Sequence, residues 1–160
     1  DIGCGISYST CLLKQIFPEA KVYAINLKDT KQWKLCEIMA ERFNFNLIES
    51  INEIEEPVDI LFASEYFEHI EKPIEHLDDI VDTINPKHMI LANSFNTWGM
   101  GHFIKYDMYG TIINQDKISR IFNQHLMKNH YDNIKCGIWN NKPMIWKRND
   151  ESKASSLYRF

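Results

Sequence analysis

The sequence lacks several features that mark common functional classes. Its four cysteines include no C-x-x-C pair, which argues against a zinc ribbon or a thioredoxin-like site. No apolar run approaches the roughly 18 residues that a membrane span needs. The formal net charge of -4 gives no basic excess for gripping nucleic-acid phosphates. We therefore expect a cytoplasmic protein with reduced thiols and no membrane span.

The remaining composition is that of an ordinary globular domain, in which helix-like and strand-like stretches alternate. The expected helices are 7–17, 29–43 (capped by Asp29), 73–84 and 115–127. The expected strands are 21–27, 45–50, 58–63, 88–95, 134–139 and 144–148. This alternation predicts an α/β fold with a doubly wound, mostly parallel sheet and a C-terminal antiparallel hairpin strand. The domain should span 1–148, with a flexible tail over 149–160.

The opening residues DIGCGISYST place two glycines in a tight turn after an acidic residue. Such a turn lets the backbone approach a small ligand closely. A dinucleotide fingerprint would need a third glycine at position 8, where the chain has Tyr8. An adenosylmethionine site fits better, with Asp1 facing the amino end of the ligand while Gly3 and Gly5 pass beneath it. A purely structural turn is the open alternative.

A later stretch, VDILFASEYFEHIEKPIEHLDDIVDTINPKHMILANSFN, strengthens this interpretation. With the glycine turn it resembles the class I S-adenosylmethionine-dependent methyltransferases, over residues 1 to about 148. The resemblance implies a Rossmann-like fold and a strand and helix missing ahead of the turn. Ser7 stands where the family has its third glycine. Asn26 stands where the family has an acidic residue that binds the ribose hydroxyls, and an amide forms weaker hydrogen bonds to them than a carboxylate does. The implied cofactor-binding residues are Asp1, Gly3, Cys4, Gly5, Asn26, Leu27, Ser64 and Glu65.

The motif E-x-x-E-H, formed by Glu65, Glu68 and His69, follows the most continuous apolar strand. It can bring two carboxylates and an imidazole to one side of a pocket, a set that suits Mg²⁺ or Mn²⁺. It resembles the motif with which ubiquinone-biosynthesis O-methyltransferases and small-RNA 3′-terminal 2′-O-methyltransferases hold a divalent metal. The RNA branch adds a further histidine, here His102. Metal-free alternatives are His69 as a solitary base and a purely structural His69.

Methyl transfer from a sulfonium needs an aligned acceptor and removal of its proton. The catalytic roles therefore fall on His69 and Glu68. We expect an S-adenosylmethionine-dependent methyltransferase that acts on an oxygen of a small molecule, with a divalent metal as an option. The alternatives are a metal-independent C, N or O methyltransferase and a catalytically silent binding or scaffold protein. RNA is less favoured as acceptor, and the missing Pro-Pro and Pro-Cys motifs argue against DNA.

The connection from 96 to 114 shows no steady period. We expect this connection to form a wall of the acceptor site, with its aromatic residues, Gly99 and Gly101 forming a lid over a flat or apolar acceptor. The alternative is an aromatic cluster that packs on the sheet edge. The aromatic side chains of the connection are Trp98, Phe103, Tyr106 and Tyr109. The histidines that we expect in solvent are His76, His125 and His130.

Overall fold

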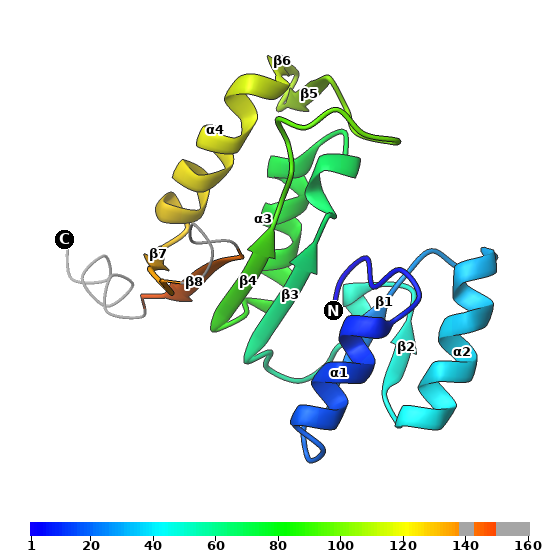
Figure 1. The fold of residues 1–160 in the computed structure, drawn as a ribbon. Helices are drawn as coiled ribbons and strands as arrows, with labels where there is room; N and C mark the ends of the chain where they lie inside the picture. Colours follow the sequence, from blue (N-terminus) through cyan, green and yellow to red (C-terminus); the bar gives the residue numbers. More distant parts are fainter. Residues whose placement is uncertain (138–142, 150–160) are drawn as a thin grey trace.

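The computed structural model describes residues 1–137 and 143–149 and has a mixed α/β fold (Figure 1). Its helices are α1 (Tyr8–Ile16), α2 (Lys31–Phe43), α3 (Pro73–Ile84) and α4 (Gln115–Lys128), with 3₁₀ turns η1 (Ile51–Glu53) and η2 (Phe67–His69). Its strands are β1 (Tyr23–Ile25), β2 (Asn46–Ile48), β3 (Ile60–Ser64), β4 (His88–Ala92), β5 (Lys105–Met108), β6 (Thr111–Asn114), β7 (Tyr131–Ile134) and β8 (Met144–Arg148). The expected tail lies outside the described residues, apart from residue 149.

The helix ends are set by capping residues. The Thr30 side chain accepts a hydrogen bond from the Trp33 amide at 3.0 Å, so α2 begins after Thr30 and the predicted cap at Asp29 is wrong. α3 begins at Pro73, whose fixed φ suits the first turn, and ends at Ile84, where Asn85 caps it in the left-handed region. α3 therefore confirms the predicted helix with its predicted bounds.

The first residues of the chain run between two parallel strand pairs, β1–β2 and β3–β4. The Ile2 amide donates to the Phe62 carbonyl at 2.9 Å, and the Ile25 amide donates to the Asp1 carbonyl at 2.8 Å. β4–β8, β7–β8 and β5–β6 are antiparallel, so a mostly parallel doubly wound sheet is not confirmed. An antiparallel hairpin, β7–β8, does close the described elements, and its second strand is where the sequence predicted it. The predicted first strand over 134–139 is wrong for its described part, because β7 ends at Ile134 and residues 135–137 are not in a strand. Residues 138 and 139 lie outside the described residues.

The β5–β6 hairpin occupies the stretch that showed no sequence period. Its two-residue turn holds Tyr109 and Gly110, both at positive φ, which matches the twist of the flanking strands. Tyr106 of β5 is fully buried, and its hydroxyl donates to the Glu68 carbonyl at 3.2 Å. Tyr106 therefore belongs to the core, and the hairpin braces the E-x-x-E-H segment from outside.

Two apolar clusters hold the elements in place. The larger packs α3 and α4 against β3, β4 and β8, with Phe67, Leu77, Met89, Phe122 and Trp146 among its buried members. The smaller joins α1, α2 and β1 through Cys4, Cys11, Ala24, Cys36 and Phe45. All four cysteines are free thiols. Within the described ranges, none of the helices has the length and apolarity that crossing a bilayer requires.

Candidate functional site

The glycine turn lies at the carboxyl end of the short Asp1–Gly3 segment, between β1 and β3. Gly3 and Gly5 both have positive φ, of 67° and 58°. A Cβ at Gly3 would lie only 2.2 Å from Cδ2 of Tyr66, so this glycine makes room for a ring of the protein itself. A Cβ at Gly5 would meet no atom within 4 Å. Gly5 therefore faces the open side of the turn.

Asp1 is joined to the start of α1 by hydrogen bonds. Its Oδ2 accepts from the hydroxyls of Ser9 and Thr10, both at 2.6 Å. Cys4, between the two glycines, is buried, and its thiol sulfur is 3.4 Å from the Ser7 hydroxyl. Burial raises the pKa of Cys4 to about 11, which keeps the thiol neutral. These contacts fix the shape of the turn, while the predicted cofactor roles of Asp1 and Cys4 stay predictions.

Asn26 braces the turn from β1. Its Nδ2 donates to the Gly5 carbonyl at 2.6 Å, and its Oδ1 accepts from the Leu27 amide at 2.8 Å. Leu27 is 75% exposed beside it. Both ends of the Asn26 amide thus have protein partners, and a bond to a ribose would be additional to them or replace one. The predicted cofactor roles of Asn26 and Leu27 stay predictions.

An acidic cluster forms at the carboxyl ends of β3 and β4. Glu65 follows Ser64, the last residue of β3, and takes a positive φ of 50°, which turns the chain into η2. The Ser94 amide donates to Oε1 of Glu68 at 2.9 Å, and the Ser94 hydroxyl donates to Oε1 of Glu65 at 2.6 Å. Ser94 therefore holds both carboxylates in place, a role that no local sequence signal marked.

Glu68 is fully buried, and its Oε2 has no hydrogen-bond partner. Burial, followed by the nearby Glu65 charge, raises the pKa of Glu68. Ligand atoms of Glu65, Glu68 and His102 all lie within 4.8 Å of one another. Two carboxylate oxygens and one imidazole nitrogen are a donor set that fits Mg²⁺ or Mn²⁺, and a cation would satisfy the unpartnered oxygen. The residues present therefore fit a divalent metal.

The two histidines of the site lie side by side but differ in position. Nδ1 of His102 is 2.9 Å from the Thr97 carbonyl oxygen. His69 is exposed, and its ring packs edge-on against that of His102, with centroids 4.7 Å apart. Three of the four predicted ligands are thus brought together, while His69 lies outside that group. Its predicted roles stay predictions.

Gly99 and Gly101, which the sequence assigned to a lid over the acceptor, shape the loop that carries His102. A Cβ at Gly99 would lie 2.9 Å from Nε2 of His102, and one at Gly101 would lie 3.1 Å from Nδ1 of His69. Gly101 also has φ of 79°. Their predicted role in a lid stays a prediction. Trp98, beside these glycines, is 85% exposed, and its predicted acceptor contact stays a prediction.

Two histidines expected in solvent have side-chain partners. Nε2 of His76 is 2.8 Å from the Tyr66 hydroxyl, and burial lowers the pKa of His76. Nε2 of His125 is 2.6 Å from Oδ1 of Asp78, which links α4 to α3. The expectation of solvated side chains is therefore wrong for His76 and His125, while His130 is exposed as expected.

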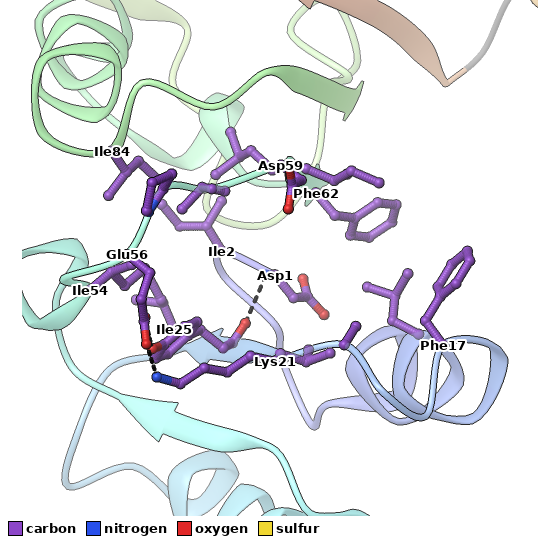
Figure 2. A pocket seen from close by; sticks show the side chains of 18 residues that line it. Asp1, Ile2, Phe17, Lys21, Ile25, Ile54, Glu56, Asp59, Phe62 and Ile84 are labelled. Carbon is purple, nitrogen blue, oxygen red and sulfur yellow. Dashed lines mark hydrogen bonds and ion pairs between the residues drawn. The ribbon is translucent and has the colours of Figure 1, made fainter.

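A cavity of about 450 Å³ lies away from the acidic cluster (Figure 2). It is walled by α1, β1 and the start of β3, with Phe17 and Phe62 on one side. An ion pair between Lys21 and Glu56 lies at its edge. Asp1 contributes to the wall, whereas Glu65, Glu68 and His102 do not. Cavity size alone therefore does not locate the candidate site.

No family model and no curated protein matches the sequence. Among solved structures, the crystal structure of the small RNA methyltransferase HEN1 is similar, with a TM-score of 0.58 and 16% sequence identity. The similarity covers 93% of this chain and 23% of that chain. At this identity the similarity shows the fold alone. The described elements therefore form a fold that occurs in a methyltransferase, over less than a quarter of that protein.

Proposed function

We propose that this chain transfers a methyl group from S-adenosylmethionine to a hydroxyl oxygen of a small molecule. The observation that carries the proposal is the buried Glu68 carboxylate, whose Oε2 has no partner although Glu65 and His102 lie close by. A buried charge in that state is costly unless a cation or a donor completes it. Its place at the end of β3, next to the glycine turn, is where a donor and an acceptor would meet.

The proposed donor site combines the glycine turn with the ends of β1 and β3. Gly5 offers open space, and Oδ1 of Asp1 is not the oxygen that Ser9 and Thr10 occupy. Asn26 and Leu27 lie at the end of β1, where they would face the ribose and the adenine. Ser64 and Glu65 would bound the methionine end. The fold shared with a methyltransferase supports this arrangement.

Mg²⁺ or Mn²⁺ would be held by Glu65, Glu68 and His102, and would supply charge that makes an acceptor hydroxyl more acidic. Ser94 fixes the two carboxylates, so the acceptor oxygen would meet a preorganised site. His69 is proposed as the general base, because its exposed imidazole lies beside the cluster without joining it. The balanced step moves the methyl from sulfur to the acceptor oxygen, while the hydroxyl proton goes to His69.

Calorimetry with S-adenosylhomocysteine tests the donor site. We expect binding heat and a raised melting temperature, and no response at millimolar ligand would refute donor binding. Methyl transfer is then measured with radiolabelled donor against a panel of small hydroxyl compounds and, separately, single-stranded RNA. Transfer to RNA alone, with strongly salt-dependent binding, would refute the small-molecule acceptor.

Manganese binding, followed by electron paramagnetic resonance, tests the metal site. Glu65→Ala should lose bound Mn²⁺, whereas the control Glu71→Ala removes an exposed carboxylate outside the cluster and should keep it. Equal Mn²⁺ content in the two variants would refute the proposed ligands. Donor binding that persists with no methyl transfer to any acceptor would instead favour a binding protein without catalysis.

A further inference from the structure

Two edge strands face each other across the cavity of about 450 Å³ (Figure 2). Among the named strands that the structure describes, β1 pairs only with β2, and β3 stands at one end of the order β3–β4–β8–β7. The cavity lies between the amino-terminal parts of β1 and β3, with residues 21–23 and 59–62 in its lining. An edge strand presents N–H and C=O groups that form a template for another strand. The cavity is therefore bounded by two such templates.

The segment 1–3 already pairs with both edges at one end of the cavity. The Asp1 nitrogen donates to the Tyr23 carbonyl at 2.9 Å, and the Ile2 amide donates to the Phe62 carbonyl at 2.9 Å. The pairing with β1 is parallel. Because the N–H and C=O of one strand residue point toward the same neighbour, the amides of Tyr23 and Phe62 face the gap as well. A strand placed in line with this segment would continue the pairing on both sides.

Apolar side chains wall the cavity on both faces of the gap. Phe17, directly after α1, lies on one side, and Ile84, the last residue of α3, lies on the other (Figure 2). Phe17 is 52% exposed and Ile60 of β3 is 49% exposed, so both side chains are only half covered. A parallel strand that is buried on both faces has a continuous aliphatic sequence. An aliphatic strand therefore fits this cavity better than one in which polar residues alternate.

The charged side chains of the lining all have partners within the protein. Lys21 pairs with Glu56, and Asp59 pairs with Lys87. Oδ2 of Asp1 accepts from two hydroxyls of α1, as described above. A charged ligand would have to displace one of these pairs or be desolvated against apolar walls, which is unfavourable. The lining therefore favours an uncharged occupant.

We propose that this cavity binds an extended aliphatic strand of a partner protein, which inserts between β1 and β3 and runs parallel to both. Its carbonyls would accept from the amides of Tyr23 and Phe62, and its side chains would fill the space between Phe17 and Ile84. Such strand addition obtains affinity from the main chain and specificity from the side-chain pockets. The insertion would join β1–β2 and β3–β4–β8–β7 into one sheet. The interaction needs neither a metal nor a methyl donor, so it goes beyond the proposed function and can fail independently of it.

Backbone amide hydrogen exchange tests the proposal with a synthetic peptide. The probe is acetylated and amidated, with two lysines for solubility followed by four valines, which match residues 59–62 along the cavity. We expect the peptide to slow exchange at Tyr23 and Phe62, because both amides become donors to it. The amides of β6, which does not line the cavity, should keep their exchange rates. Unchanged exchange at Tyr23 and Phe62 with millimolar peptide would overturn the proposal.

The same peptide with alternate valines N-methylated separates strand pairing from apolar binding. It keeps the aliphatic side chains but lacks half of the valine N–H groups, so it should give no protection. Equal protection by the two peptides would overturn the proposal, since the cavity would then take apolar molecules without pairing to either edge.

Phe17→Asp should weaken binding of the unmethylated peptide, measured by calorimetry, by about tenfold or more, because the peptide would desolvate the new carboxylate. Leu12→Asp is the matched control. Leu12, on α1, is 55% exposed but does not line the cavity, so this variant should keep the wild-type affinity. Equal affinities of the two variants would place the peptide elsewhere on the protein and overturn the proposal.

Discussion

Glu68→Gln should stabilise the protein in the absence of a divalent metal and make it less stable than the wild type when the metal is added. Without metal, the wild-type carboxylate is buried beside Glu65 with one oxygen unpartnered. The glutamine keeps an oxygen for the Ser94 amide and offers an N–H₂ group to Glu65. Relief of one unsatisfied buried group is worth about 1–2 kcal/mol. For a chain of this size that amounts to a rise in melting temperature of about 2–8 °C.

With Mn²⁺ the wild type should have the higher melting temperature, because only the wild type keeps both carboxylate ligands. At a metal concentration of about 100 times its dissociation constant, binding adds about 2.7 kcal/mol to the folded state, or about 5–11 °C. The assay is thermal unfolding of both proteins in chelator and in excess Mn²⁺. A variant less stable than wild type in chelator would refute the orphan-carboxylate argument. Equal stabilisation of both proteins by Mn²⁺ would refute Glu68 as a ligand.

Three further predictions follow from contacts around the site. Gly3→Ala should destabilise more than Gly5→Ala in urea unfolding, because both glycines have positive φ but only Gly3 lies against Tyr66; equal losses would contradict this. Burial lowers the pKa of His76 below its unfolded value near 6.5, so the unfolded state binds more protons and stability falls as pH drops below about 6.5. His76→Gln should flatten that decline in chemical denaturation, and an unchanged slope would contradict it. Asp78→Ala should speed amide hydrogen exchange at the β5–β6 turn, which Asp78 holds through the Tyr109 hydroxyl, while exposed Asp79→Ala should not.

Elements with a strong local pattern could be predicted from the sequence. α3 was predicted with its bounds because its apolar period, Pro73 and Asn85 all agree on one helix. The cap of α2 was misplaced by one residue, since Asp29 and Thr30 are both good capping residues and only the observed φ decides between them. The β5–β6 hairpin was missed because its turn begins with Tyr109, and a tyrosine at positive φ is no turn signal.

Local sequence patterns could not predict the long-range contacts at the site. The E-x-x-E-H spacing identified Glu65 and Glu68, but it could not show that Ser94, from the segment after β4, would bond to both of them. Nor could the spacing show that Glu68 is buried and His69 is exposed. η2 is a tight turn in which neighbouring residues point in different directions, so Glu68 is buried while His69 is exposed.

Tyr66 couples the two halves of the candidate site. Its ring fills the space that Gly3 leaves, and its hydroxyl bonds to His76 on α3. Because Tyr66 directly follows Glu65, the positions of the glycine turn and of the first acidic residue are fixed by the same side chain. A displacement of the turn would therefore be transmitted to the carboxylates. In a methyl-transfer enzyme this linkage would align donor and acceptor, for which errors of about 1 Å are costly.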